Sequence, residues 1–185
     1  MQQKTKTNKT AKMIQEIVKN AKYITSVTDF HGTWIDNGCQ YCTDTHRMLM
    51  LYEPIDVEKV EQIEQNGKIV DRANKMFEQA EMECTETIEL PSVTEIKEKI
   101  KELIGRKYKT NKALYRLNND PTLAVVNAKY LVECMEAIGA TELKYNPNKP
   151  KNGMLFMETE LGKVVLLPVY DKEGMVGYWK IDYVV

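Results

Sequence analysis

The sequence lacks the features that mark several classes of protein. None of its apolar runs approaches the ~18–20 residues that a membrane-spanning helix needs. Its first twelve residues are polar and basic, without the apolar core of an export signal. Its nine glycines form neither a GxGxxG nor a GxxxxGK loop, the patterns that hold phosphate groups. We therefore expect a soluble protein of the cytoplasm, with no membrane partner.

Cysteine and histidine are also scarce, with four and two residues. The cysteines show no disulfide framework, and 185 residues can bury a core without bridges, so we expect reduced thiols. Cys39, Cys42 and His46 have metal-like spacing, but no nearby second pair completes a set of four ligands. Only His31 could supply another imidazole, which argues against a catalytic triad. We expect no cofactor, no metal and no enzymatic activity.

Charge is balanced overall but unevenly distributed. The 26 basic and 27 acidic side chains give a net charge of −1, so bulk charge predicts no nucleic-acid partner. Residues 1–22 carry six lysines against one acid, whereas residues 53–104 carry fourteen acids and seven bases. Residues 105–118 hold five bases and no acid. Each run is either a solvated face or a binding surface, and the sequence leaves both interpretations open.

The first part of the chain predicts a helix, three strands and a second, longer helix. Apolar residues three and four apart indicate a helix, and Asn37-Gly38 is a strong signal for a hairpin turn. Acidic residues around a second apolar stripe indicate the long helix. The expected elements are a helix over 11–22, strands over 34–36, 39–43 and 48–52, and a helix over 56–82.

The last part predicts two capped helices and several short strands. Ser92 and Glu95 form a capping box before one helix, and Asn127 caps another that ends at Gly139. The second helix presents one apolar face, formed by Leu131, Cys134, Met135 and Ile138. The expected strands cover 88–90, 123–126, 142–145, 154–159, 164–170 and 175–185.

This order of elements predicts one α+β domain over residues 1–185 with a weak internal repeat. A helix followed by strands forms the front half, and a strand, a helix and three strands form the back half. A helical insertion separates the halves, and a strand-like tail follows them. The expected boundaries are about 10–53, 55–120, 121–170 and 171–185.

Three segments resemble bacterial sliding clamps, the β subunits of DNA polymerase III. Thr43-Asp44-Thr45-His46-Arg47-Met48 is similar to the Thr-Asp-Gly-His-Arg-Leu corner of the family. The strand and Asn-capped helix over Leu123–Ala137 and the Pro-ending strand over Val164–Val169 also resemble clamp segments, in the same order. The resemblance covers about 80–90 residues and implies a DNA-clamp-like domain of two helix-plus-antiparallel-sheet halves.

The chain also departs from the clamp family at several points. Clamps carry three such domains, and this chain has room for one. The glycine of the corner is Thr45 here, and a β-branched residue resists a positive φ. The first strand of the front half should precede Thr10, where the residues are poor strand formers.

The resemblance implies a non-enzymatic DNA polymerase accessory protein of the processivity-factor type. Its partners would be duplex DNA and a DNA polymerase or another replication protein. In clamps the helices face the DNA backbone, and phosphate contacts of this kind are independent of sequence. The matching basic residues on the first helix are Lys9, Lys12, Lys19 and Lys22.

The resemblance also implies a pocket for a partner peptide. In the family its two pieces come from neighbouring domains, so a second copy of this chain would complete it. Clamp rings contain six domains, so a homo-oligomer of six copies would form a ring if this protein encircles DNA alone. If the tail over 175–185 covers a sheet edge instead, the protein would stay monomeric or form a closed pair. Alternatively, Val165 and Leu167 are plain core residues. The matching pocket residues are Thr43, Asp44, His46, Arg47 and Met48, with Val165, Leu167 and Pro168.

Two other functions remain open at this point. A clamp-like scaffold can serve as a protein-interaction module that does not bind DNA. A metal-dependent nuclease is the enzymatic alternative, because Glu142 and Lys144 lie two residues apart on an expected strand and Asp120 lies upstream. Two carboxylates would then hold a divalent ion that activates water, and the lysine would steady the phosphate.

Overall fold

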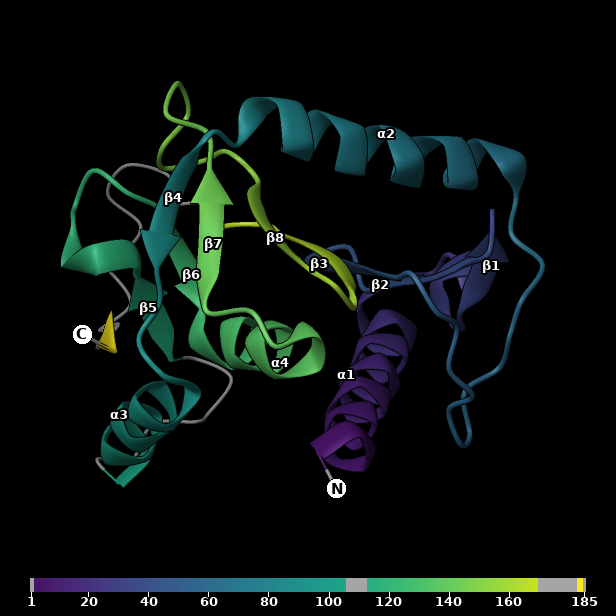
Figure 1. Ribbon diagram of the computed structural model, residues 1–185, viewed down its shortest axis with the longest axis horizontal. Helices are drawn as coiled ribbons and strands as arrows, with labels where there is room; N and C mark the ends of the chain where they lie inside the picture. Colours follow the sequence, from purple (N-terminus) through teal and green to yellow (C-terminus); the bar gives the residue numbers. More distant parts are fainter. Residues whose placement is uncertain (1, 106–112, 170–182, 185) are drawn as a thin grey trace.

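The computed structural model describes residues 2–105, 113–169 and 183–184 (Figure 1), with side chains over residues 8–102 and 113–169. The described part is an α+β protein with four α-helices and an antiparallel main sheet, as expected for the coarse fold class. The helices are α1 (Gln2–Ile24), α2 (Gly67–Glu83), α3 (Val93–Gly105) and α4 (Ala128–Ile138). Among the described residues, no helix is long and apolar enough to cross a membrane.

The main sheet has seven strands in the order β1-β2-β3-β9-β8-β7-β4, and all neighbours are antiparallel. Its strands are β1 (Trp34–Asp36), β2 (Cys39–Thr43), β3 (Arg47–Leu51), β4 (Glu86–Glu89), β7 (Glu142–Tyr145), β8 (Leu155–Thr159) and β9 (Gly162–Leu166). A second, three-stranded sheet joins β5 (Leu114–Arg116), β6 (Val125–Asn127) and β10 (Tyr183–Val184), with β10 parallel to β5.

The internal repeat predicted from the sequence is visible in the order of elements. One helix and a three-stranded meander, α1 with β1-β2-β3, is repeated as α4 with β7-β8-β9. The last strands of the two meanders pair with each other in the centre of the sheet, where Leu49 lies opposite Val164. Gly162 permits the close approach of the two strands, since a Cβ at this position would lie 2.1 Å from the Met50 carbonyl oxygen. The two halves therefore share one continuous sheet.

The helices form layers on both faces of this sheet (Figure 1). Helices α1 and α4 pack side by side on one face, where Thr10 donates a hydrogen bond to the Ala137 carbonyl oxygen at 2.6 Å. Helix α2 crosses the opposite face and buries Ala73, Phe77 and Ala80 against the sheet. Because successive side chains of a strand point to opposite faces, each strand contributes apolar side chains to the packing on both faces of the sheet. Cys42 packs with α1 and α4, whereas Tyr41 packs with α2.

Several turns and helix caps form as the local sequence predicts. Asn37 and Gly38 adopt φ values of 48° and 79° in the turn between β1 and β2. The capping box of α3 is present, since Glu95 accepts from the Ser92 backbone N–H at 2.7 Å. The Asn127 side chain accepts from two backbone N–H groups at the start of α4, and Gly139 ends that helix with a φ of 74°. These signals act within a few residues, so the sequence alone reveals them.

The helix predicted over residues 56–82 is wrong in its first half. Helix α2 begins at Gly67, because the side chain of Asn66 accepts a hydrogen bond from the Lys68 backbone N–H and caps it. Upstream of this cap the chain is not helical, and Lys59 has a φ of 62°. Gln62 instead forms a parallel bridge with Thr33 beside β1.

Other predicted elements also differ from the structure. The segment before Thr10 is helical, because α1 extends back to Gln2, and the strand that the clamp resemblance implied there does not form. The insertion over 55–120 is not only helical, since β4 extends the main sheet beside β7 and β5 pairs with β6. Most of the tail over 171–185 lies outside the described residues.

Candidate functional site

The corner between β2 and β3 is a tight turn built from its own side chains. The Asp44 Oδ1 atom accepts from the backbone N–H groups of His46 and Arg47, both at 3.1 Å. Thr43 donates through its hydroxyl to the Arg47 carbonyl oxygen at 2.9 Å. Thr45 adopts a φ of 70°, the conformation that favours glycine, so the turn imposes backbone strain on a β-branched residue.

The two predicted pieces of the peptide pocket lie side by side in one chain. Met48 of the corner pairs with Val165 of β9, and the Leu167 backbone N–H donates to the His46 carbonyl oxygen at 2.8 Å. The expectation that a second copy must bring these pieces together is therefore wrong. In this fold the last strands of the two halves are neighbours, which a comparison with separate clamp domains did not reveal.

Arg47 anchors the corner to α4, on the face of the sheet that α1 and α4 cover. Its Nε atom donates to Asp44 at 3.2 Å, its Nη1 atom donates to Glu133, and its guanidinium lies 4.2 Å from the centre of the Tyr130 ring. The side chains of Asp44 and Arg47 are fully buried. Burial opposes the charge of Arg47, but Cys134, Asp44 and Glu133 together raise its pKa above the ordinary value.

This network corrects the predicted roles of Asp44 and Arg47. The resemblance placed both in a pocket for a partner peptide, but each charged group is enclosed in the protein, and Asp44 and Glu133 pair with the Nε and Nη1 atoms of Arg47. The Nη2 atom of Arg47 is buried without a hydrogen-bond partner among the described residues. Glu133 completes the cluster from α4, 86 positions away in the sequence, and no local pattern marks it. The two residues therefore position the corner, and a partner cannot reach their charges.

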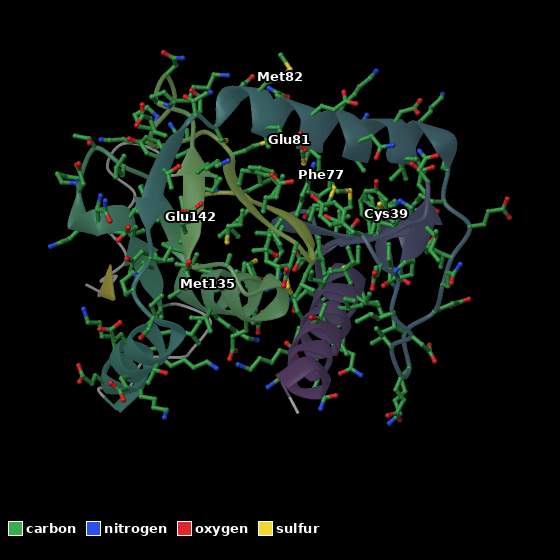
Figure 2. The ribbon with its side chains drawn as sticks, in the orientation of Figure 1. Cys39, Phe77, Glu81, Met82, Met135 and Glu142 are labelled. Carbon is green, nitrogen blue, oxygen red and sulfur yellow. The ribbon has the colours of Figure 1, made fainter. Side chains whose placement is uncertain are left out.

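An apolar cavity of about 170 Å³ opens on the opposite face of the sheet, between α2 and the strands β1, β3 and β9. The sheet side of the cavity and the corner contribute Trp34, Thr43, Thr45, Arg47, Met48, Val165 and Leu167. Helix α2 and the segment before β1 contribute Ile69, Arg72, Ala73, Met76 and Phe30. Phe77 closes the space further along α2, where it points toward the sheet (Figure 2). The cavity is thus a candidate binding site for an apolar group.

Five of the eight predicted pocket residues border this cavity: Thr43, Arg47, Met48, Val165 and Leu167. Arg47 borders the cavity at the start of β3, but its guanidinium lies on the other face of the sheet, against α4. His46 is exposed and Pro168 is half-buried, and neither lines the cavity. The sequence pattern does not reveal Trp34 and the α2 residues, because only the packing of α2 across the sheet brings them to this place.

The four predicted DNA-contacting lysines differ in their environments. Lys9 forms an ion pair with Glu136 of α4 at 3.1 Å. Burial opposes ionisation of Glu136, but Lys97 and Lys9 lower its pKa below the ordinary value. The other three, Lys12, Lys19 and Lys22, are exposed and form no ion pair with the described part of the chain. Lys12 borders a shallow groove beside Lys129 of α4, whereas Lys19 and Lys22 lie toward Lys59 near the C-terminal end of α1.

The residues considered for metal and nuclease chemistry are not brought together. Cys42 is buried on the face of the sheet that α1 and α4 cover, whereas Cys39 packs toward α2 on the opposite face. Asp120 accepts hydrogen bonds from its neighbour Thr122, and Glu142 is exposed at the start of β7 (Figure 2). Within residues 2–105, 113–169 and 183–184, no group of three or more His, Cys, Asp and Glu side chains is placed to hold a metal ion.

The burial of the cysteines predicts their reactivity. Burial raises the pKa of Cys84 to about 11 and that of Cys134 to about 12, and it also raises the pKa of Cys42. Because the thiolate is the reactive form, we expect iodoacetamide at pH 8 to modify only half-buried Cys39 in the native protein. Peptide mass mapping before and after denaturation measures this. Modification of Cys134 at the same rate as Cys39 would contradict the assigned burial.

Comparison with models of protein families, with curated proteins and with solved structures found no match. The function is therefore inferred from the residues of this chain and their arrangement. Two surfaces are candidates for binding: the apolar cavity beneath α2 and the lysine-bearing face of α1.

Proposed function

We propose that the protein is a sliding-clamp-like DNA polymerase accessory protein that binds a replication partner and duplex DNA without catalysis. The arrangement of its elements supports this proposal. Two helix-plus-meander halves share a sheet, and their helices lie together on one face. The clamp resemblance implies this layout, in which the helices face DNA and the sheet forms the outer wall. Helix α2 and strand β4 are additions to that plan.

The observation that carries the proposal is the meeting of the corner with β9. These two segments are the ones that form the partner pocket in clamps, and here they border one apolar cavity. A concave apolar site with a few polar groups is the usual form of a binding pocket. Because both segments belong to one chain, a single protomer contains the whole site. A replication protein would bind on this outer face, beneath α2, while the face with α1 and α4 remains free for DNA.

The proposed DNA contact uses the exposed lysines of α1. Lys12, Lys19 and Lys22 supply three positive charges without ion-pair partners in the described structure. The neighbouring face of α4 is less favourable, since Lys129 pairs with Glu16 at 3.1 Å and with Glu133 at 3.4 Å. We therefore expect weak, salt-sensitive binding that does not depend on DNA sequence.

Reversing the charge of Lys12, Lys19 and Lys22 to Glu should weaken binding to duplex DNA. The dependence of log K on log salt should fall by about one unit for each lost phosphate contact. Fluorescence anisotropy of a labelled duplex at several salt concentrations measures both effects. A matched control replaces Lys68, Lys75 and Lys151 with Glu, three exposed lysines on or beside α2 that form no ion pair within the described part of the chain.

Equal losses in the two triple variants would show that only net charge matters. Unchanged affinity in the α1 variant would show that this face is merely solvated. If the unaltered protein does not bind duplex DNA at low salt, the protein-interaction module becomes the better assignment. A nuclease would instead cleave the duplex in the presence of magnesium.

Assembly into a six-copy ring stays a prediction. The two outer strands of the main sheet are β1 and β4, and an open edge is a site where another strand can add. Gln62 already bridges to Thr33 beside β1. Strand β4 exposes Glu86, Thr87 and Glu89, and charged residues at an edge oppose such pairing. A mass measurement by light scattering, with and without duplex DNA, distinguishes the ring from the monomer.

A further inference from the structure

Trp34 presents an unsatisfied hydrogen-bond donor at the cavity. Its side chain is 1% exposed, and its ring stacks on Tyr41 with 5.6 Å between the ring centres. The Tyr41 hydroxyl donates to Asn74 at 3.0 Å, so this neighbour is already engaged. The indole Nε1 atom of Trp34 has no hydrogen-bond partner among the described residues. Buried polar groups are normally paired, so a bound group that carries an acceptor would satisfy this donor.

The charges of α2 run against its helix dipole. The positive N-terminal end of a helix favours acidic residues, but the first half of α2 carries Lys68, Arg72 and Lys75 with one acid. The second half carries Glu78, Glu81 and Glu83, where basic residues would be favourable. A local conflict of this kind is typical of a functional site.

The two ends of α2 also differ in their partners. At the acidic end, Glu81 pairs with Lys163, and Glu83 accepts from Asn146 at 2.9 Å and lies 3.9 Å from Lys149. At the basic end, the three cations form no ion pair within the described part of the chain. Arg72 borders the cavity itself. The cavity therefore has at its edge a guanidinium, that of Arg72, with no ion-pair partner among the described residues.

The size and lining of the cavity limit the group that it can hold. A volume of about 170 Å³ is close to the ~150 Å³ of an engineered apolar cavity that binds benzene. The lining is mostly apolar, and Met48 and Met76 can adjust their shape to an aromatic ring. One aromatic side chain is therefore the expected occupant.

We propose that this cavity binds an acidic peptide segment of a partner protein through one aromatic side chain. The ring enters the space beneath α2, a peptide carbonyl accepts the Trp34 indole N–H, and flanking carboxylates face Arg72 and Lys68. This assignment rests on the proposed function, because the cavity is its partner-binding site, and it adds the chemistry of the partner. Nucleic acid is disfavoured as the occupant, because the lining is largely apolar and carries few donors for phosphate.

The first test is the anisotropy of a fluorescein-labelled ten-residue peptide with one Phe between two pairs of Asp. The full chain should bind it saturably, and replacing Phe with Ser or all four Asp with Lys should weaken binding at least tenfold. Arg72→Glu should also weaken binding at least tenfold, whereas the matched reversal Lys99→Glu on α3 should change it less than twofold. Both positions are exposed, so both variants should fold.

The second test follows the indole N–H signal of Trp34 by nitrogen-15 NMR. The chain has two tryptophans, and Trp179→Phe identifies the Trp34 signal. The signal should move to lower field and saturate with the peptide, because its N–H gains an acceptor. Equal binding of the Lys peptide, equal affinity after Arg72→Glu, or an unmoved Trp34 signal at saturation would overturn the proposal. Equally strong competition by a single-stranded oligonucleotide would also overturn it.

The two proposals can fail separately. Loss of peptide binding with retained, lysine-dependent DNA binding would reject the acidic peptide and leave the clamp-like function standing. Peptide binding without DNA binding would support the cavity assignment and favour the protein-interaction module. The same preparation of the full chain serves both measurements.

Discussion

Replacing Asp44 with Asn is expected to lower the free energy of unfolding by about 3 kcal/mol. Asp44 and Arg47 are fully buried as an ion pair at 3.2 Å. Removing one charge of a buried pair leaves the other uncompensated, which typically costs ~3–5 kcal/mol. We place this variant at the lower end because Glu133 still pairs with Arg47. Urea unfolding followed by circular dichroism measures the change.

A surface ion pair provides the matched control for Asp44→Asn. Lys59 and Glu58 lie 3.3 Å apart, with side chains that are 83% and 80% exposed. Water screens such a pair, so Lys59→Gln should change the stability by no more than about 0.5 kcal/mol. A loss below about 1 kcal/mol in Asp44→Asn would show that water reaches the corner and that the cluster does not anchor it to α4.

Leu131→Ala is expected to lower the free energy of unfolding by about 2–5 kcal/mol. Leu131 is 0% exposed and belongs to the core cluster that joins α1, α4 and the sheet. Truncation removes buried methyl groups and leaves a cavity that the rigid neighbours do not fill. The same urea measurement applies. Because α4 packs against both halves, the whole chain should still unfold in one transition, at a lower urea concentration.

Met82→Ala is the matched control for Leu131→Ala. Met82 is also helical, but it is 79% exposed and points away from the sheet at the end of α2 (Figure 2). Its truncation should change stability by less than about 0.5 kcal/mol. A similarly small loss for Leu131→Ala would mean that the apolar stripe of α4 does not pack as described.

Elements with strong local signals were predicted well. The stripe of α4, its Asn127 cap and its Gly139 end depend on residues within one or two helical turns. The hairpin at Asn37 needs only two residues with positive φ. Periodicity and caps act over short distances, so no knowledge of the rest of the chain is required.

Predictions failed where a distant segment overrode the local preference. Residues 56–66 carry helix-like spacing, but the bridge between Gln62 and Thr33 draws them along the edge of the sheet. The position of β4 also depends on β7, which follows more than fifty residues later. Pairing between distant strands adds hydrogen bonds and apolar burial that the local pattern does not contain.

The sequence by itself determined the α+β class, the repeat of helix and meander, and the buried face of α4. It also identified the corner and β9 as related segments. Only the tertiary structure decided that these segments meet in one chain, that Glu133 neutralises Arg47, and that α2 leaves a cavity beside Trp34. Local patterns record the environment of one element at a time. A cavity and a buried ion pair depend on how separate elements pack, and the packing energy is shared among residues far apart in the chain.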